Sequence, residues 1–214
     1  MKMKLVTGFS AWIFCLLLAA MPGTASAKDV PAEVLAALPE KAGVFEADGG
    51  VQTYDEPGLG ASRVYRVPDG TWVTVYLYDL DMPVIGTGVE DKTIKDACQQ
   101  SMRDIREMER QGHYADVKMA EESKMTLGLP SGKKLTLFSV TYSLSFVRKD
   151  AQENETTIKM FSQLFVTGLR DHIFKIRVSR PEGGKPVSAE ETEAALKTLM
   201  EAVIAVPKKA PPAD

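Results

Sequence analysis

The 214-residue sequence predicts an α+β domain: an antiparallel β-sheet of about six strands, with amphipathic helices packed on one or both of its faces. Three observations predict this class. Polar and apolar residues alternate in the long segments of the C-terminal half, short polar turns separate these segments, and two other segments place apolar residues every three or four positions. Strands joined by such short turns must be antiparallel, because a parallel pair needs a crossover connection.

Residues 1–27 have the pattern of a secretory signal peptide. Two lysines precede the apolar run of residues 11–20, and small residues at 25–27 offer a cleavage site before Lys28. This run is shorter than the roughly 20 residues that a membrane helix needs, and no second such run follows. We therefore expect a mature protein without a membrane span in the periplasm of a Gram-negative bacterium, with secretion as the alternative.

The composition of the mature chain excludes several classes of protein. Removal of residues 1–27, which carry two lysines and no acid, changes the net charge from −3 to −5 and argues against nucleic acid as the partner. Cys98 is the one cysteine that remains, so no disulfide can form within the chain. The length suits one domain at residues 28–206, followed by a disordered tail at 207–214. We expect a monomer, and no cofactor-binding motif is present.

The N-terminal part is expected to contain a short helix and three strands. Pro31 suits the first turn of a helix at residues 31–38, and Pro39 ends it. Strands follow at 51–55, 63–67 and 71–78. A Pro-Asp-Gly triplet joins the last two strands and predicts a tight hairpin.

The most distinct helix is expected at residues 91–111. Its apolar residues recur at intervals of four, four, three and three, and Gly112 suits the position after its last turn. Cys98 lies on this apolar stripe. We therefore expect its thiol to be buried rather than reactive.

Three strands after a weak strand at 116–119 are expected to form a meander. Segment 136–146 is apolar at its even positions, and segments 157–167 and 172–179 follow after short polar turns. Ser188 and Glu191 then match a capping box for a final helix that ends near Val206.

This order of elements resembles the layout of PsbP-like domains. The resemblance rests on the hairpin between Arg63 and Tyr78, the meander between Phe138 and Val178, and the helix after Ser188. It covers about two-thirds of the mature chain and involves no shared functional motif. It implies an accessory or binding module more than an enzyme.

The outward face of the meander is the candidate binding surface. Lys159, Lys175 and Arg177, together with Gln163, Ser143 and Ser145, are expected to line one side of the sheet, either as a binding patch or as solvent-facing positions. A second set, Trp72, Tyr76 and Tyr78, shares one face of its strand. It serves either in packing or as a ligand or partner surface.

Other motifs are weak when their context is considered. Segment 128–134 has three residues between its glycines where a phosphate-binding loop needs four, so a hairpin turn is the better interpretation. Its S-x-x-K match has none of the partner motifs of penicillin-interacting enzymes. Asp79 and Asp81 do not continue into a calcium loop. His113 and His172 have no well-placed partner in the sequence, and we expect neither to be catalytic.

The function expected from the sequence is an exported, non-enzymatic binding or accessory module. Its expected partner is an envelope or periplasmic protein. Two alternatives stay open: a periplasmic enzyme of the hydrolase type with a dispersed site, and a secreted effector or inhibitor. An enzyme would require titratable groups that converge in one concave pocket.

Overall fold

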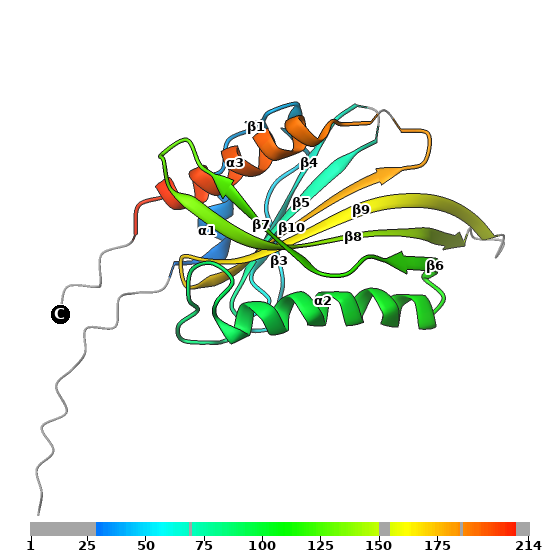
Figure 1. Cartoon of the computed structure of the whole chain (residues 1–214), viewed down its shortest axis with the longest axis horizontal. Coiled ribbons are helices and arrows are strands. Elements are labelled where there is room, and N and C mark those ends of the chain that lie inside the picture. Colours follow the sequence, from blue (N-terminus) through cyan, green and yellow to red (C-terminus); the bar gives the residue numbers. More distant parts are fainter. Residues whose placement is uncertain (1–28, 69, 150–154, 185, 209–214) are drawn as a thin grey trace, which may run out of the picture. The chain divides into compact units, whose positions relative to one another are not determined.

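The computed structural model describes residues 29–68, 70–149, 155–184 and 186–208 (Figure 1). The signal peptide predicted for residues 1–27 lies outside these residues, as do residues 209–214 of the predicted tail. Within the described ranges, no helix is long and apolar enough to cross a membrane.

The described residues form an α+β domain with one antiparallel sheet of ten strands. Their order is β1-β2-β4-β5-β10-β9-β8-β6, with β3 beside β4 and β7 beside β8. The strands are β1 (Lys41–Ala42), β2 (Phe45–Ala47), β3 (Gln52–Thr53), β4 (Ala61–Arg66), β5 (Trp72–Tyr78), β6 (Tyr114–Met119), β7 (Ser123–Gly128), β8 (Lys134–Lys149), β9 (Glu155–Leu169) and β10 (His172–Pro181).

The predicted number of about six strands is therefore too low. Strands β1 and β2 have only two and three residues, too few to produce a recognisable alternation of polar and apolar positions. Strand β7 has a single fully buried residue, Leu127, so its pattern is also weak.

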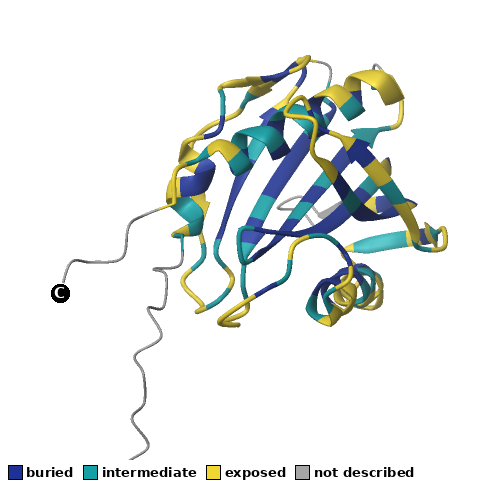
Figure 2. Ribbon diagram, turned by 60° about the vertical axis from the view of Figure 1, so that its left-hand side comes forward, coloured by how far each residue is buried: buried dark blue, intermediate teal, exposed yellow. Residues whose placement is uncertain are grey.

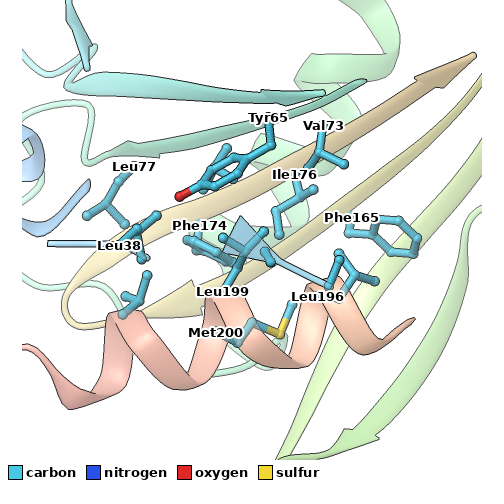
Figure 3. Packing of buried hydrophobic residues seen from close by; sticks show 14 of the residues in the cluster. Leu38, Tyr65, Val73, Leu77, Phe165, Phe174, Ile176, Leu196, Leu199 and Met200 are labelled. Carbon is cyan, nitrogen blue, oxygen red and sulfur yellow. The ribbon is translucent and has the colours of Figure 1, made fainter. Parts of the chain in front are cut away.

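Apolar side chains form two clusters that contain different helices. One cluster joins α1 (Pro31–Ala36) and α3 (Ala189–Ala205) to strand residues such as Phe174 and Ile176. The other joins α2 (Lys92–Arg110) to residues such as Leu164 and Ile173. Figure 1 shows α2 and α3 on opposite sides of the sheet, and Figure 2 shows that the central strands are largely buried. Figure 3 shows Leu199 and Met200 of α3 among the residues of the first cluster.

The predicted hairpin and meander are confirmed. Strands β4 and β5 pair from Ala61 opposite Leu77 to Arg66 opposite Trp72. Strands β8, β9 and β10 pair consecutively, all antiparallel. The β9–β10 turn has Arg170 and Asp171 in the left-handed conformation, with φ of 57° and 61°, as a two-residue hairpin turn of the favoured twist requires.

Both long helices begin where the sequence predicts. Asp91 accepts a hydrogen bond from the backbone N–H of Thr93 at the start of α2. Ser188 and Glu191 form the predicted capping box at the start of α3, with bonds of 3.1 and 2.9 Å. These caps satisfy backbone N–H groups that have no partner within the helix.

The thiol of Cys98 is completely buried under α2. Burial raises its pKa to about 12, so the nucleophilic thiolate is scarce at neutral pH. We expect native protein to react slowly with a thiol reagent such as 5,5′-dithiobis(2-nitrobenzoate) and to react fully in urea. Cys98→Ser should lower the free energy of unfolding by about 1–3 kcal/mol, because it buries a hydroxyl group. Rapid labelling of the folded protein would contradict the buried position.

Candidate functional site

A groove runs between α2 and the face of the sheet that α2 covers. It has one chamber of about 330 Å³ beside Ala97 of α2, which we call the outer chamber, and one of about 130 Å³ nearer the end of α2, beside Met108, which we call the inner chamber. The two chambers share Tyr76, Ser101, Asp104 and Lys175 in their walls. We call this continuous recess the α2 groove.

The walls of the α2 groove come from α2, from strands β5, β6, β8, β9 and β10, and from two loops. Lys175 and Arg177 come from β10, on the same face of that strand. The other residues of the outer chamber are Tyr54, Leu59, Tyr78, Leu80, Ala97 and Gln100. The other residues of the inner chamber are Ile105, Met108, Tyr114, Tyr142 and Leu164.

Lys175 occupies the centre of the groove. Its amino group lies 4.6 Å from the centre of the Tyr76 ring and 5.1 Å from that of Tyr78, in the range of cation–π contacts. Among the described residues, no hydrogen-bond acceptor or carboxylate is within contact distance of this amino group. Lys175 is therefore a half-buried cation whose amino group contacts aromatic rings.

Arg177 lines the inner chamber and is also incompletely satisfied. Its Nη1 donates a 3.4 Å hydrogen bond to Tyr114 Oη, and its guanidinium carbon lies 5.5 Å from the centre of the Tyr142 ring. Its Nε is buried and has no hydrogen-bond partner among the described residues. Buried donors of this kind are uncommon in folded proteins and call for an explanation.

Burial lowers the pKa of Lys175, while Asp104 opposes this shift and Arg177 adds to it. Because the folded pKa lies below the unfolded value of about 10.4, the folded protein binds fewer protons than the unfolded chain between the two values. The protonated lysine thus lowers stability at neutral pH, and this loss is relieved as the pH rises from the folded pKa to the unfolded value.

Lys175→Met removes this charge but keeps the length of the side chain. We expect the wild-type protein to gain stability relative to Lys175→Met as the pH rises from 7 toward 10.5, because only the wild type loses the cost of a buried charge. Urea denaturation of both proteins at several pH values measures the difference. A relative loss in the wild type over this range would contradict the burial of Lys175.

The three predicted site residues do not form one surface. Lys175 and Arg177 are opposite Val166 and Leu164 of β9, so they face α2. On β9, Lys159 is an odd number of residues from both Val166 and Leu164, so its side chain faces the other side of the sheet. There it is exposed and lies 3.6 Å from Glu182. All three residues were predicted on one face because the sequence alone does not establish the register across the β9–β10 turn. A shift of one residue in that register moves every side chain of β10 to the opposite face.

The other residues predicted for this surface are on the same face of the sheet as Lys159. Gln163 is an even number of residues from it, and Ser143 and Ser145 are opposite Phe161 and Lys159. The aromatic set is on the other face, where Tyr76 and Tyr78 line the groove and Trp72 packs against the α2 cluster. The groove residues of α2, such as Ser101 and Asp104, were not identified from the sequence. Ser101 could have been noticed, because it is a polar residue on the apolar stripe of the helix.

The histidines lie outside the groove. His113 is exposed after the end of α2, where its backbone bonds to Met108 and Val147. His172 is fully buried, with Nδ1 2.6 Å from the carbonyl oxygen of Arg170 and Nε2 4.0 Å from a carboxylate oxygen of Asp79. No group of three or more histidine, cysteine or acidic side chains in the described ranges is arranged to hold a metal.

Two other recesses are less suited to a ligand. One of about 460 Å³ adjoins Lys133, Lys134 and Lys208, which are exposed at the β7–β8 turn and beyond α3. Residues 128–134 form that turn, as predicted, with Gly128 opposite Lys134. The other, of about 270 Å³, lies near the start of α3 and includes Phe161 and Thr192. In contrast to these sites, the α2 groove combines half-buried cations with several aromatic rings.

No protein-family model matches the chain, and no curated protein matches it. The assignment of the α2 groove as the candidate site therefore depends on its geometry alone.

Proposed function

We propose that this protein is an exported, non-enzymatic binding module of the bacterial periplasm or cell envelope, and that the α2 groove is its binding site. The observation that carries the proposal is the position of Lys175, a half-buried cation that lies in the groove between the rings of Tyr76 and Tyr78 and whose pKa is lowered by burial. Charged groups whose pKa is shifted by burial are common at functional sites, where a protein retains them although they lower its stability.

The form of the groove favours a small molecule over the envelope protein expected from the sequence. The outer chamber has a volume of about 330 Å³, within the range of small-molecule pockets. Its wall is mostly aromatic and aliphatic, and the polar residues in it are Gln100, Ser101, Asp104 and Lys175. This division between an apolar wall and a few orienting groups is typical of ligand sites.

The chemistry of the lining residues favours binding over catalysis. Hydrolases of the serine or cysteine type need a nucleophile in contact with a base. The residues that line the groove include no histidine or cysteine, and Asp104, their only carboxylate, accepts a hydrogen bond from Gln100. Lys175 and Asp104 do converge here, so an enzyme that uses this pair is the second candidate.

A bulky residue at the rim of the groove tests the proposed site. Gln100 is exposed on α2 and lines the outer chamber, so Gln100→Trp should obstruct the groove without disturbing the core. Lys95→Trp, at an exposed position of α2 that does not line the groove, is the matched control. We expect the neutral naphthalene dye prodan to bind the wild type and the control equally, and Gln100→Trp at least about tenfold more weakly.

The fluorescence of prodan, which brightens and shifts to the blue in apolar surroundings, measures this binding. Circular dichroism should show that both variants remain folded. Equal dye binding by wild type and Gln100→Trp would exclude the groove as the site.

A further inference from the structure

The charges that line the α2 groove do not balance. Lys175 and Arg177 contribute two positive charges, and Asp104 contributes one negative charge. Asp104 is exposed and lines both chambers, whereas the two cations are half-buried on the sheet. The inner chamber, which is lined by both cations and this one carboxylate, therefore has a net positive charge.

Both cations line the groove and make few polar contacts within the protein. In the described part of the chain, the amino group of Lys175 contacts the rings of Tyr76 and Tyr78, and the guanidinium of Arg177 makes one hydrogen bond, from Nη1 to Tyr114 Oη. The two residues are two positions apart on one face of β10, so their Cα atoms are about 7 Å apart. Long side chains at this spacing can both reach the oxygens of one acidic group.

The outer chamber limits the rest of the ligand. Its volume of about 330 Å³ equals that of about 11 water molecules at ~30 Å³ each, which suits a body of roughly two fused rings. Tyr54, Tyr78, Leu59 and Leu80 supply its apolar wall. Tyrosine rings offer flat and rigid surfaces that pack well against another aromatic ring.

We propose that the ligand of the α2 groove is an organic monoanion that joins one acidic group to an aromatic body of about two rings. The acidic group lies between Lys175 and Arg177, and the aromatic body fills the outer chamber. This inference rests on the proposed function, since it assigns the ligand class of the same site.

Three naphthalenes of similar size test the charge of the ligand. They are 1-naphthoate, the neutral 1-naphthalenemethanol and the cationic 1-naphthalenemethylamine, and isothermal titration calorimetry measures their binding to the full exported protein. We expect the acid to bind at least about tenfold more tightly than the alcohol, and the amine to bind most weakly. Decanoate, an aliphatic acid, should bind more weakly than 1-naphthoate.

Single substitutions test the position of the acidic group. Lys175→Met and Arg177→Met should each reduce the preference for the acid over the alcohol by about tenfold or more, while the alcohol still binds. Lys159→Met is the matched control, because Lys159 is an exposed lysine on the opposite face of the sheet. It should leave all affinities unchanged.

The outcomes separate this inference from the proposed function. Equal binding of acid and alcohol, or tighter binding of decanoate, would overturn the ligand class but leave the groove as a binding site. An equal loss in Lys159→Met and Lys175→Met would place the acidic group elsewhere and overturn the inference. Failure of all four compounds to bind would overturn both proposals.

Discussion

Replacement of Arg170 by Met should lower the free energy of unfolding by about 3–5 kcal/mol, since it leaves a buried carboxylate without its partner. Arg170 and Asp29 form an ion pair in which both side chains are 7% exposed, with Nη2 2.7 Å and Nε 2.8 Å from one oxygen of Asp29. Nη1 also donates to carbonyl oxygens at the end of α3, including that of Val203 at 3.3 Å. One side chain thus joins the N-terminal segment, the β9–β10 turn and the last helix.

The neighbouring residue supplies a matched control. Asp171 forms a 3.6 Å ion pair with Lys208 in which both side chains are exposed, and such pairs contribute about 0–1 kcal/mol. Asn tolerates the left-handed backbone of this turn, so Asp171→Asn should have little effect. Urea denaturation compares the two variants. Similar small losses in both would show that the Asp29–Arg170 pair does not hold these segments together.

Gly60→Ala should have the second largest effect, and it should change both stability and the groove. Gly60 has a φ of +66°, and a Cβ atom there would lie 2.0 Å from the carbonyl oxygen of Leu77 and 2.8 Å from Cα of Tyr78. The left-handed conformation costs alanine about 1–2 kcal/mol, and displacement of the backbone adds about 1–3 kcal/mol. Because Tyr78 lines the outer chamber, we also expect weaker binding of prodan.

Gly49→Ala separates the two contributions to this loss. Gly49 has a similar φ of +79°, but no atom lies within 4 Å of the position of its Cβ. The free energy of unfolding of Gly49→Ala should therefore fall only by the cost of the left-handed conformation, about 1–2 kcal/mol, and this variant should bind the dye as the wild type does. If thermal and urea denaturation gave equal losses for the two variants, the close approach of Gly60 to β5 would be refuted.

The local pattern of the chain predicts most of the fold but not its site. The stripe that contains Cys98 predicts α2, and the alternation after residue 136 predicts β8, because both depend on neighbours in the sequence. The face of each strand is different, since it depends on the register between strands. The turn at Arg170 and Asp171 places Lys175 on the face opposite Lys159, and alternation within each strand cannot reveal this.

The groove itself could not be predicted because its walls come from distant parts of the chain. Tyr54, Tyr76, Ser101 and Lys175 lie on separate elements that meet only after the sheet has formed. The sequence does single out Lys175, Arg177 and the tyrosines of β5 as candidates. What it lacks is the contact with α2, which turns a solvent-facing row of polar side chains into a recess.

The most direct test of the central claim is to locate the ligand on the protein by nuclear magnetic resonance. Amide chemical shifts of the ¹⁵N-labelled protein would be recorded during titration with 1-naphthalenemethanol and, separately, with 1-naphthoate. We predict that both compounds shift amides of Ala97–Met108 on α2 and of Tyr76 and Lys175 on the sheet. Shifts confined to the recess near Lys133 and Lys134, or the absence of shifts with both compounds, would contradict the assignment of the α2 groove as the binding site.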